Sequence, residues 1–303
     1  VLSLVEGGGP AANRVTELTH HRDRTGHVLG ITGPPGAGKS TLVARLVSDF
    51  VEGGRLPGVI AVDPSSPLTG GAILGDRIRM AEIDSVAFVR SMATRGHSGG
   101  LALAIPGAVR VLSASGFDPI IIETVGVGQV EVDVTAAADT CVVVATPGMG
   151  DAVQANKAGL LEVADVFVVN KADRPGAADV RRDLEHMLEL SHVTGHRSAD
   201  RPPILMTNSL DGEGTEQLLT AIDDHRKQLV DTDELAARHR RRAQFEIESR
   251  ARADFEAAMA RTVGRPDPAA RIDAAARGEL SPIEASGDVR RAIADELINS
   301  DAD

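Results

Sequence analysis

Seven short runs rich in Val and Ile recur along the sequence as far as residue 209. Most are flanked by Gly, Pro or Asp, which predicts short buried strands. Stretches with helical spacing of apolar residues lie between most of them, and such alternation is typical of parallel strands joined by covering helices. The sequence therefore predicts an α/β fold with a mostly parallel central sheet and helices on both faces, the expected strands being 27–33, 58–64, 85–92, 119–126, 140–147, 165–173 and 203–209.

The length of 303 residues allows one large α/β domain with helical additions. The strand pattern disappears after about residue 228, where Ala, Arg and Glu dominate. We expect an N-terminal helical segment at 1–26, a nucleotide-binding domain at 27–230 and a C-terminal helical extension at 231–303. Within the extension we expect one long helix at 233–263, a break at "GRPDP" and a last helix at about 282–298.

Charge and cysteine content argue against several classes of protein. The net charge is −12 and the basic residues are scattered, so a nucleic-acid partner finds little support. The one basic run, "RHRRR" at 238–242, is expected to be a solvated helix face. The single cysteine, Cys141, lies in an apolar run and is expected to be a buried thiol in a reducing compartment. Because no membrane segment or signal peptide is evident, we expect a cytoplasmic protein.

The stretch "GPPGAGKS" matches the phosphate-loop pattern in full, after an expected strand and before an expected helix. Glycines there let backbone N–H groups wrap phosphates, and the helix N-terminus favours negative charge. We expect Lys39 to reach the outer phosphates, Ser40 to offer its hydroxyl to Mg²⁺ and Thr41 to contact an inner phosphate. The predicted phosphate site comprises Gly33, Pro34, Pro35, Gly36, Ala37, Gly38, Lys39, Ser40 and Thr41.

The fourth run ends in "ETVGVG", which places an acid at the end of a strand. Alone, Glu123 would more often be an ordinary strand terminus, but after a phosphate loop it is expected to hold Mg²⁺ directly or through water. Gly126 is expected to meet the γ-phosphate through its backbone. Val127 follows where small signalling GTPases carry a water-orienting glutamine, so we predict slow intrinsic hydrolysis that a partner or a rearranged loop accelerates.

The sixth run leads into "NKAD", which contains Asn170, Lys171 and Asp173. A carboxylate can accept hydrogen bonds from the ring N–H and the 2-amino group of guanine, whereas adenine would leave it unpaired. We therefore predict a GTPase that uses GTP and Mg²⁺ and releases GDP. After the seventh run, a loop is expected to close over the base through backbone N–H groups near its third and fourth residues, the loop being Thr207, Asn208, Ser209 and Leu210.

Several longer stretches resemble one family: "GVIAVDPSSPLTGGAILGDRIRM", "MATRGHSGGLA", "ETVGVGQVEVDV", "PGMGDAVQANKAG" and "NKAD". Together they are similar to the MeaB/ArgK GTPases, and the resemblance covers nearly the whole chain. It implies a GTPase of the signal-recognition-particle class that acts as a chaperone of adenosylcobalamin-dependent methylmalonyl-CoA mutase or a related acyl-CoA mutase. The family's function is to gate cofactor delivery and to limit inactivation of the mutase. Its members are similar in forming homodimers through C-terminal helices.

The resemblance also assigns residues that the pattern alone does not. Asp63 and Asp76 fall in the family segment that approaches Mg²⁺, although by spacing they read as a strand-end cap and a helix-surface acid. Lys157 is implied to bring a charge near the phosphates on activation, and it joins Lys39 and Glu123 as a catalytic candidate. The chain departs from the family at 207–209, where Thr-Asn-Ser replaces the usual Thr-Ser-Ala and puts guanine affinity in question.

Three alternatives remain at this point. A metallochaperone GTPase would need Cys or His ligands, and the chain has one Cys and a single His pair at 20–21. An ArgK-type transport-associated kinase would need a protein acceptor site, which the sequence does not display. A nucleotide-dependent binding module would use hydrolysis only to reset a complex. The pattern of the long helix leaves open whether its apolar stripe packs on its own domain or between subunits; that stripe is Ala251, Phe255, Ala258, Met259 and Val263.

Overall fold

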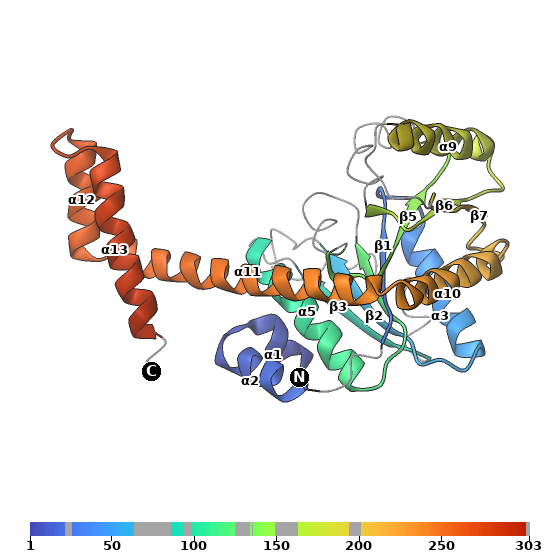
Figure 1. Ribbon diagram of the computed structural model, residues 1–303, viewed down its shortest axis with the longest axis horizontal. Helices are drawn as coiled ribbons and strands as arrows, with labels where there is room; N and C mark the ends of the chain where they lie inside the picture. The colour runs from blue at the N-terminus through green and yellow to red at the C-terminus, as the bar shows by residue number, and fades with distance from the viewer. Residues whose placement is uncertain are drawn as a thin grey trace. The chain divides into compact units, whose positions relative to one another are not determined.

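The central element of the fold is a seven-stranded sheet in the order β3-β2-β4-β1-β5-β6-β7, with every neighbouring pair parallel (Figure 1). The computed structural model describes residues 1–21, 26–63, 86–93, 98–124, 134, 136–148, 163–193 and 201–300. The predicted α/β fold with a parallel sheet is therefore confirmed. The strands are β1 (Val28–Thr32), β2 (Gly58–Asp63), β3 (Phe88–Ala93), β4 (Ile120–Thr124), β5 (Thr140–Ala145), β6 (Val166–Asn170) and β7 (Ile204–Thr207).

Helices cover both faces of this sheet because successive strand residues point to opposite sides. On one face α3 (Lys39–Glu52) and α10 (Thr215–Asp231) pack over alternate residues of the central strands, such as Ile31 and Val142. On the other face α5 (Ser98–Ala114) covers one half of the sheet and α9 (Ala177–Val193) the other half. Cys141 is a buried free thiol on the α9 side, as the sequence predicted.

Two N-terminal helices, α1 (Leu2–Gly7) and α2 (Gly9–Thr19), pack against α5. A side chain at Gly107 on α5 would collide with α1, since its Cβ would lie 2.6 Å from Cγ1 of Val5. An ion pair of 2.6 Å between Arg90 on β3 and Glu6 also holds α1. The N-terminal helices thus belong to the same compact unit as the sheet, which comprises Val1–Ala243.

The second compact unit, Gln244–Asp303, is helical. The long α11 (Glu234–Val263) crosses from the first unit into it and is followed by α12 (Pro266–Ala276) and α13 (Pro282–Ser300). We did not expect α12, because "GRPDP" predicted a break. Both prolines of that motif lie in the first turn of α12, where backbone N–H groups need no helical partner, so they are compatible with a helix start.

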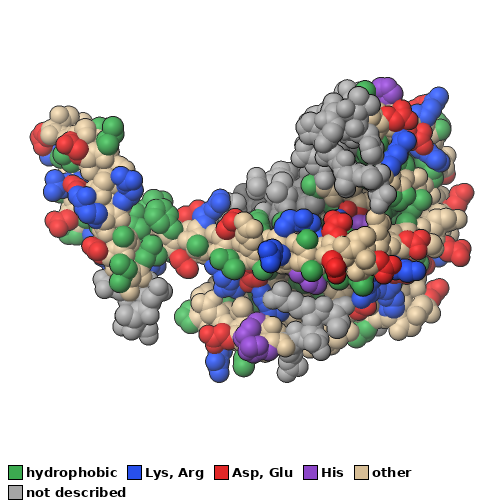
Figure 2. All heavy atoms as spheres, in the orientation of Figure 1, with side chains coloured by type: hydrophobic (Ala, Val, Ile, Leu, Met, Phe, Trp, Pro, Cys, Tyr) green, Lys and Arg blue, Asp and Glu red, His purple; other side chains and the backbone are tan. Residues whose placement is uncertain are grey.

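The surface in view in Figure 2 intersperses acidic and basic side chains. Among the described residues, no helix has both the length and the apolar character needed to cross a lipid bilayer.

The predicted solvated face at 238–242 is wrong for Arg238 and Arg242. Arg238 donates to both carboxylate oxygens of Asp165 at 2.7 Å, and Arg242, which is 7% exposed, pairs with Asp139. The two acids directly precede β6 and β5. We call these four residues the amino-edge network, because they join the start of α11 to the amino ends of two strands. The sequence showed the helical spacing of the arginines but not the acids they would meet.

Buried polar groups beside this network have shifted pKa values. Nε2 of His27 lies 2.8 Å from Oγ1 of Thr140, which lies 2.8 Å from Nδ1 of His225. Burial lowers the pKa of His27 to about 4, despite the nearby negative charge of Asp139. Burial would raise the pKa of Asp139, but hydrogen bonding from His239, the charge of Arg242 and the Val28 N–H lower it to about 2.

We therefore expect the protein to lose stability on acidification in two stages. His27 has a pKa of 6.5 when unfolded and about 4 when folded, so the unfolded chain takes up the proton first and stability falls between these values. At roughly 1.4 kcal/mol per pKa unit, the loss from His27 is on the order of 3 kcal/mol. The contribution of Asp139 is then lost as the pH falls from 3.8 towards about 2.

The measurement is urea unfolding followed by circular dichroism between pH 7 and pH 4, since the chain has no Trp or Tyr. His27→Gln should flatten the dependence of unfolding free energy on pH. His186→Gln, on the exposed surface of α9, is the matched control and should leave it unchanged. An equal slope in the wild type and His27→Gln would contradict the assignment.

Candidate functional site

Two glycines in the loop between β1 and α3 have a positive φ and lie close to neighbouring strands. Gly33 has φ 140° and its Cβ would lie 2.1 Å from the carbonyl oxygen of Val144 on β5. Gly38 has φ 86° and its Cβ would lie 2.5 Å from Nδ2 of Asn170 on β6. Both positions therefore require glycine for the loop to sit tightly against the neighbouring strands.

Lys39 begins α3 and extends back across this loop. Its Nζ donates to the carbonyl oxygens of Gly33 at 2.7 Å and Pro34 at 3.0 Å. The ammonium group is thus held over the loop at the N-terminus of a helix, where backbone N–H groups also point outward. This arrangement offers positive charge and donors to an anionic ligand.

Ser40 and Glu123 bring two oxygen groups together beside Lys39. The Ser40 hydroxyl donates to Oε1 of Glu123 at 2.7 Å, and the two residues are only 8% and 6% exposed. Glu123 reaches this place because β4 pairs with β1, which aligns it with Ile31. A hydroxyl and a carboxylate are hard oxygen donors that suit Mg²⁺, so these two residues fit the predicted ion.

Four predicted residues cannot be placed in this way. Asp63 ends β2, and its side chain lies outside the described residues. Gly126, Asp76 and Lys157 also lie outside the described residues. Their predicted roles stay predictions.

The side chain of Asn170 joins the phosphate loop to the loop that follows β7. Its Nδ2 donates to the carbonyl oxygen of Ala37 at 2.9 Å. Its Oδ1 accepts from the Thr207 hydroxyl at 3.2 Å and from the Ser209 hydroxyl at 2.7 Å. Asn170 is only 2% exposed, so these bonds are formed away from water. Lys171, the next residue, also contacts the phosphate loop, because its Nζ donates to the carbonyl oxygen of Gly36 at 2.7 Å.

The loop after β7 also has internal hydrogen bonds. Nδ2 of Asn208 donates to Asp211 at 2.7 Å, and Oδ1 of Asn208 accepts from the Leu210 N–H at 3.3 Å. The Ser209 N–H donates to Oδ1 of Asn170 at 3.2 Å. The two amides predicted to meet the guanine carbonyl thus have partners within the protein, at distances near the long end for hydrogen bonds.

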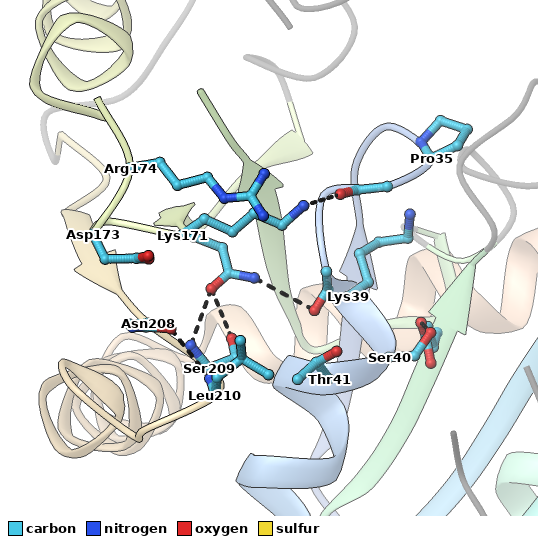
Figure 3. A pocket seen from close by; sticks show the side chains of 14 residues that line it. Pro35, Lys39, Ser40, Thr41, Lys171, Asp173, Arg174, Asn208, Ser209 and Leu210 are labelled. Carbon is cyan, nitrogen blue, oxygen red and sulfur yellow. Dashed lines mark hydrogen bonds between the residues drawn. The ribbon is translucent and has the colours of Figure 1, made fainter. Parts of the chain in front are cut away.

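These elements surround a pocket of about 510 Å³, a volume typical of small-molecule sites (Figure 3). Figure 3 shows the side chains converging from the phosphate loop, the end of β6 and the loop after β7. Gly33, Pro34, Ala37 and Thr207 do not line the pocket but support residues that do. The lining residues are Pro35, Gly36, Gly38, Lys39, Ser40, Thr41, Glu123, Asn170, Lys171, Asp173, Arg174, Asn208, Ser209 and Leu210.

Arg174 lines the pocket and was not predicted. Figure 3 labels it among the side chains that line the pocket. It directly follows Asp173, so a basic residue next to a predicted base-binding acid was the signal available in the sequence.

Residues 1–263 match the model of the family described as methylmalonyl-CoA mutase-associated GTPase MeaB. A Pyrococcus horikoshii protein that carries the name GTPase is 46% identical over 251 residues, 82% of this chain and 79% of that protein. A Geobacillus kaustophilus protein named fused isobutyryl-CoA mutase is 37% identical over 221 residues, 71% of this chain and 20% of that protein. The crystal structure of LAO/AO transport system kinase is 25% identical with a TM-score of 0.67, covering 96% of this chain and 91% of that chain.

Substitution of Asn170 tests whether its hydrogen bonds hold the two loops of the site together. Asn170→Ala would leave buried partners on both loops unpaired, so we expect the free energy of unfolding to fall by about 3 kcal/mol and GTP affinity to fall roughly 100-fold. Thr207→Val removes one bond of the set and should have a much smaller effect on both. Thermal unfolding and titration with labelled GTP measure the two changes. Equal effects of the two variants would show that Asn170 does not join the loops.

Proposed function

Because the chain belongs to the MeaB family of GTPases, we propose that its GTP hydrolysis serves an adenosylcobalamin-dependent acyl-CoA mutase, with methylmalonyl-CoA mutase as the first candidate. The supporting observation is the pocket, which combines a phosphate loop with a guanine-type acid on one sheet edge. The relative named fused isobutyryl-CoA mutase supports the class of partner, since a similar stretch occurs within that protein. In this proposal the GTPase gates cofactor delivery and protects the mutase from inactivation.

The phosphate end of the pocket would bind the nucleotide through charge and backbone donors. Lys39 would leave its carbonyl partners to contact the outer phosphates, and the amides at the start of α3 would hold the inner ones. Ser40 and Glu123 would hold Mg²⁺ directly or through water. The ion, when bound, neutralises phosphate charge.

At the other end Asp173 would select the base. Asp173 lines the same pocket as Asn208 and Ser209, and its carboxylate would accept both N–H donors of guanine. Adenine would leave that carboxylate without these donors, which disfavours ATP. The intrinsic rate is proposed to be slow and to rise in a complex with the mutase.

We propose that the protein forms a homodimer through its second unit. On α11, Phe255 and Met259 are 43% and 40% exposed, while Ala258 is buried. A second copy would remove the exposed apolar surface from water.

Asp173→Asn tests the assignment of the base. The amide would offer a donor where guanine offers one too, so we expect GTP affinity to fall roughly 100-fold. Xanthosine triphosphate, whose 2-carbonyl accepts that donor, should bind more tightly than it does to the wild type. Titration with labelled nucleotides measures both changes. Asp183→Asn on the exposed face of α9 is the control, and an unchanged GTP affinity in Asp173→Asn would contradict the role of this acid.

The partner is tested by GTPase assays with and without methylmalonyl-CoA mutase and isobutyryl-CoA mutase, paired with pull-downs under GDP and a non-hydrolysable GTP analogue. We expect a faster rate and nucleotide-dependent binding with at least one mutase. No response to either would refute the chaperone role. Transfer of the γ-phosphate to a protein instead of water would favour a kinase function, the activity for which the solved relative is named.

A further inference from the structure

The loop after β7 is supported at Gly212 by a side chain from α3. Gly212 has φ 86°, and its Cβ would lie 2.7 Å from Cζ, 2.8 Å from Nη1 and 2.9 Å from Nη2 of Arg45. A point in the guanidinium plane between the two nitrogens would be clearly closer to them than to Cζ. The near-equal distances therefore place the flat face of the Arg45 guanidinium against the side of Gly212 where a Cβ would stand.

Arg45 is itself held in place from its own helix. It lies one turn after Thr41, and its Nε is 2.9 Å from Oδ1 of Asp49, whose side chain is only 10% exposed. The neighbouring residues Leu42 and Leu46 are fully buried in the core under the sheet. The guanidinium is thus mounted on the same rigid helix that begins with Lys39 and Ser40.

Hydrogen bonds connect Gly212 to residues that line the pocket. The Gly212 N–H donates to the carbonyl oxygen of Asn208 at 2.9 Å, and the Asn208 N–H donates to the carbonyl oxygen of Glu213 at 2.9 Å. The side-chain Oδ1 of Asn208 in turn accepts a hydrogen bond from the Leu210 N–H. A shift of the tip at Gly212 would therefore move Ser209 and Leu210 at the pocket wall.

We propose that Arg45 is a positioning residue for guanine recognition, acting through its flat contact with Gly212 on the loop that carries Ser209 and Leu210. The inference rests on the proposed function, in which that loop meets the base. Position 212 favours glycine because its φ is 86°, and a methyl group there would push the end of the Arg45 side chain aside and break the flat contact. The flat contact also requires arginine rather than lysine, because only the guanidinium presents a planar surface.

The test compares GTP with ATP, because ATP keeps every phosphate contact but lacks the guanine carbonyl that the loop would meet. We expect Arg45→Ala to weaken GTP and GDP binding about 10-fold, as for loss of one well-placed hydrogen bond, and to change ATP binding by less than about twofold. The selectivity for GTP over ATP should fall by the same factor. In steady-state assays KM for GTP should rise more than kcat changes. A general loss of structure would weaken both nucleotides together.

Two further variants and one control complete the experiment. Arg45→Lys should behave like Arg45→Ala, and Gly212→Ala should reproduce the loss of selectivity from the loop side. Arg181→Ala removes an ion pair of the same i, i+4 spacing and the same 2.9 Å distance on α9, and it should leave selectivity unchanged. Thermal unfolding of each variant is measured alongside.

The possible outcomes separate the two proposals. If the wild type binds GTP in preference to ATP and Arg45→Ala keeps that preference, the role of Arg45 is refuted while the proposed function stands. An equal loss of GTP and ATP binding in Arg45→Ala refutes the role as well. If the wild type itself shows no preference for GTP, the proposed function fails first.

Discussion

The amide side chain of Asn170 is the interaction on which the two ends of the site depend. One atom of the amide donates to the phosphate loop, and the other accepts from the loop after β7. An aspartate would lack the donor, so no charged isostere can make both sets of bonds. A buried group at the end of β6 therefore ties the phosphate loop to the loop after β7.

Polar side chains have different surroundings at the two edges of the sheet. At the carboxyl edge, lysines and acids face a pocket and can exchange their internal partners for a ligand. At the amino edge, Asp139 and Asp165 pair with arginines of α11 and accept backbone N–H groups at the starts of the neighbouring strands. Buried charges of this kind stabilise only when paired, since removal of one partner leaves the other desolvated. Among the described residues, the pocket thus lies at one edge of the sheet and the attachment of α11 at the other.

Local sequence was sufficient for part of this arrangement. The strands, the phosphate loop and "NKAD" could be predicted because each depends on residues adjacent in the chain, and the order of strands then brings their carboxyl ends together. The burial of Arg238 could not be predicted, because its partner Asp165 is 73 positions away and the helical pattern shows only the face. The contact of Arg45 with Gly212 is equally non-local. The helix α12 was missed for a different reason, since prolines generally indicate a break although the first turn of a helix accepts them.

The boundary between the compact units lies between Ala243 and Gln244, one residue after Arg242. Every residue that lines the described pocket, and every member of the amino-edge network, precedes that boundary. The residues of the described pocket and the residues of the second unit therefore lie on separate, consecutive stretches of the chain. The match to the family model ends at Val263, the last residue of α11, so α12 and α13 lie outside the matched stretch.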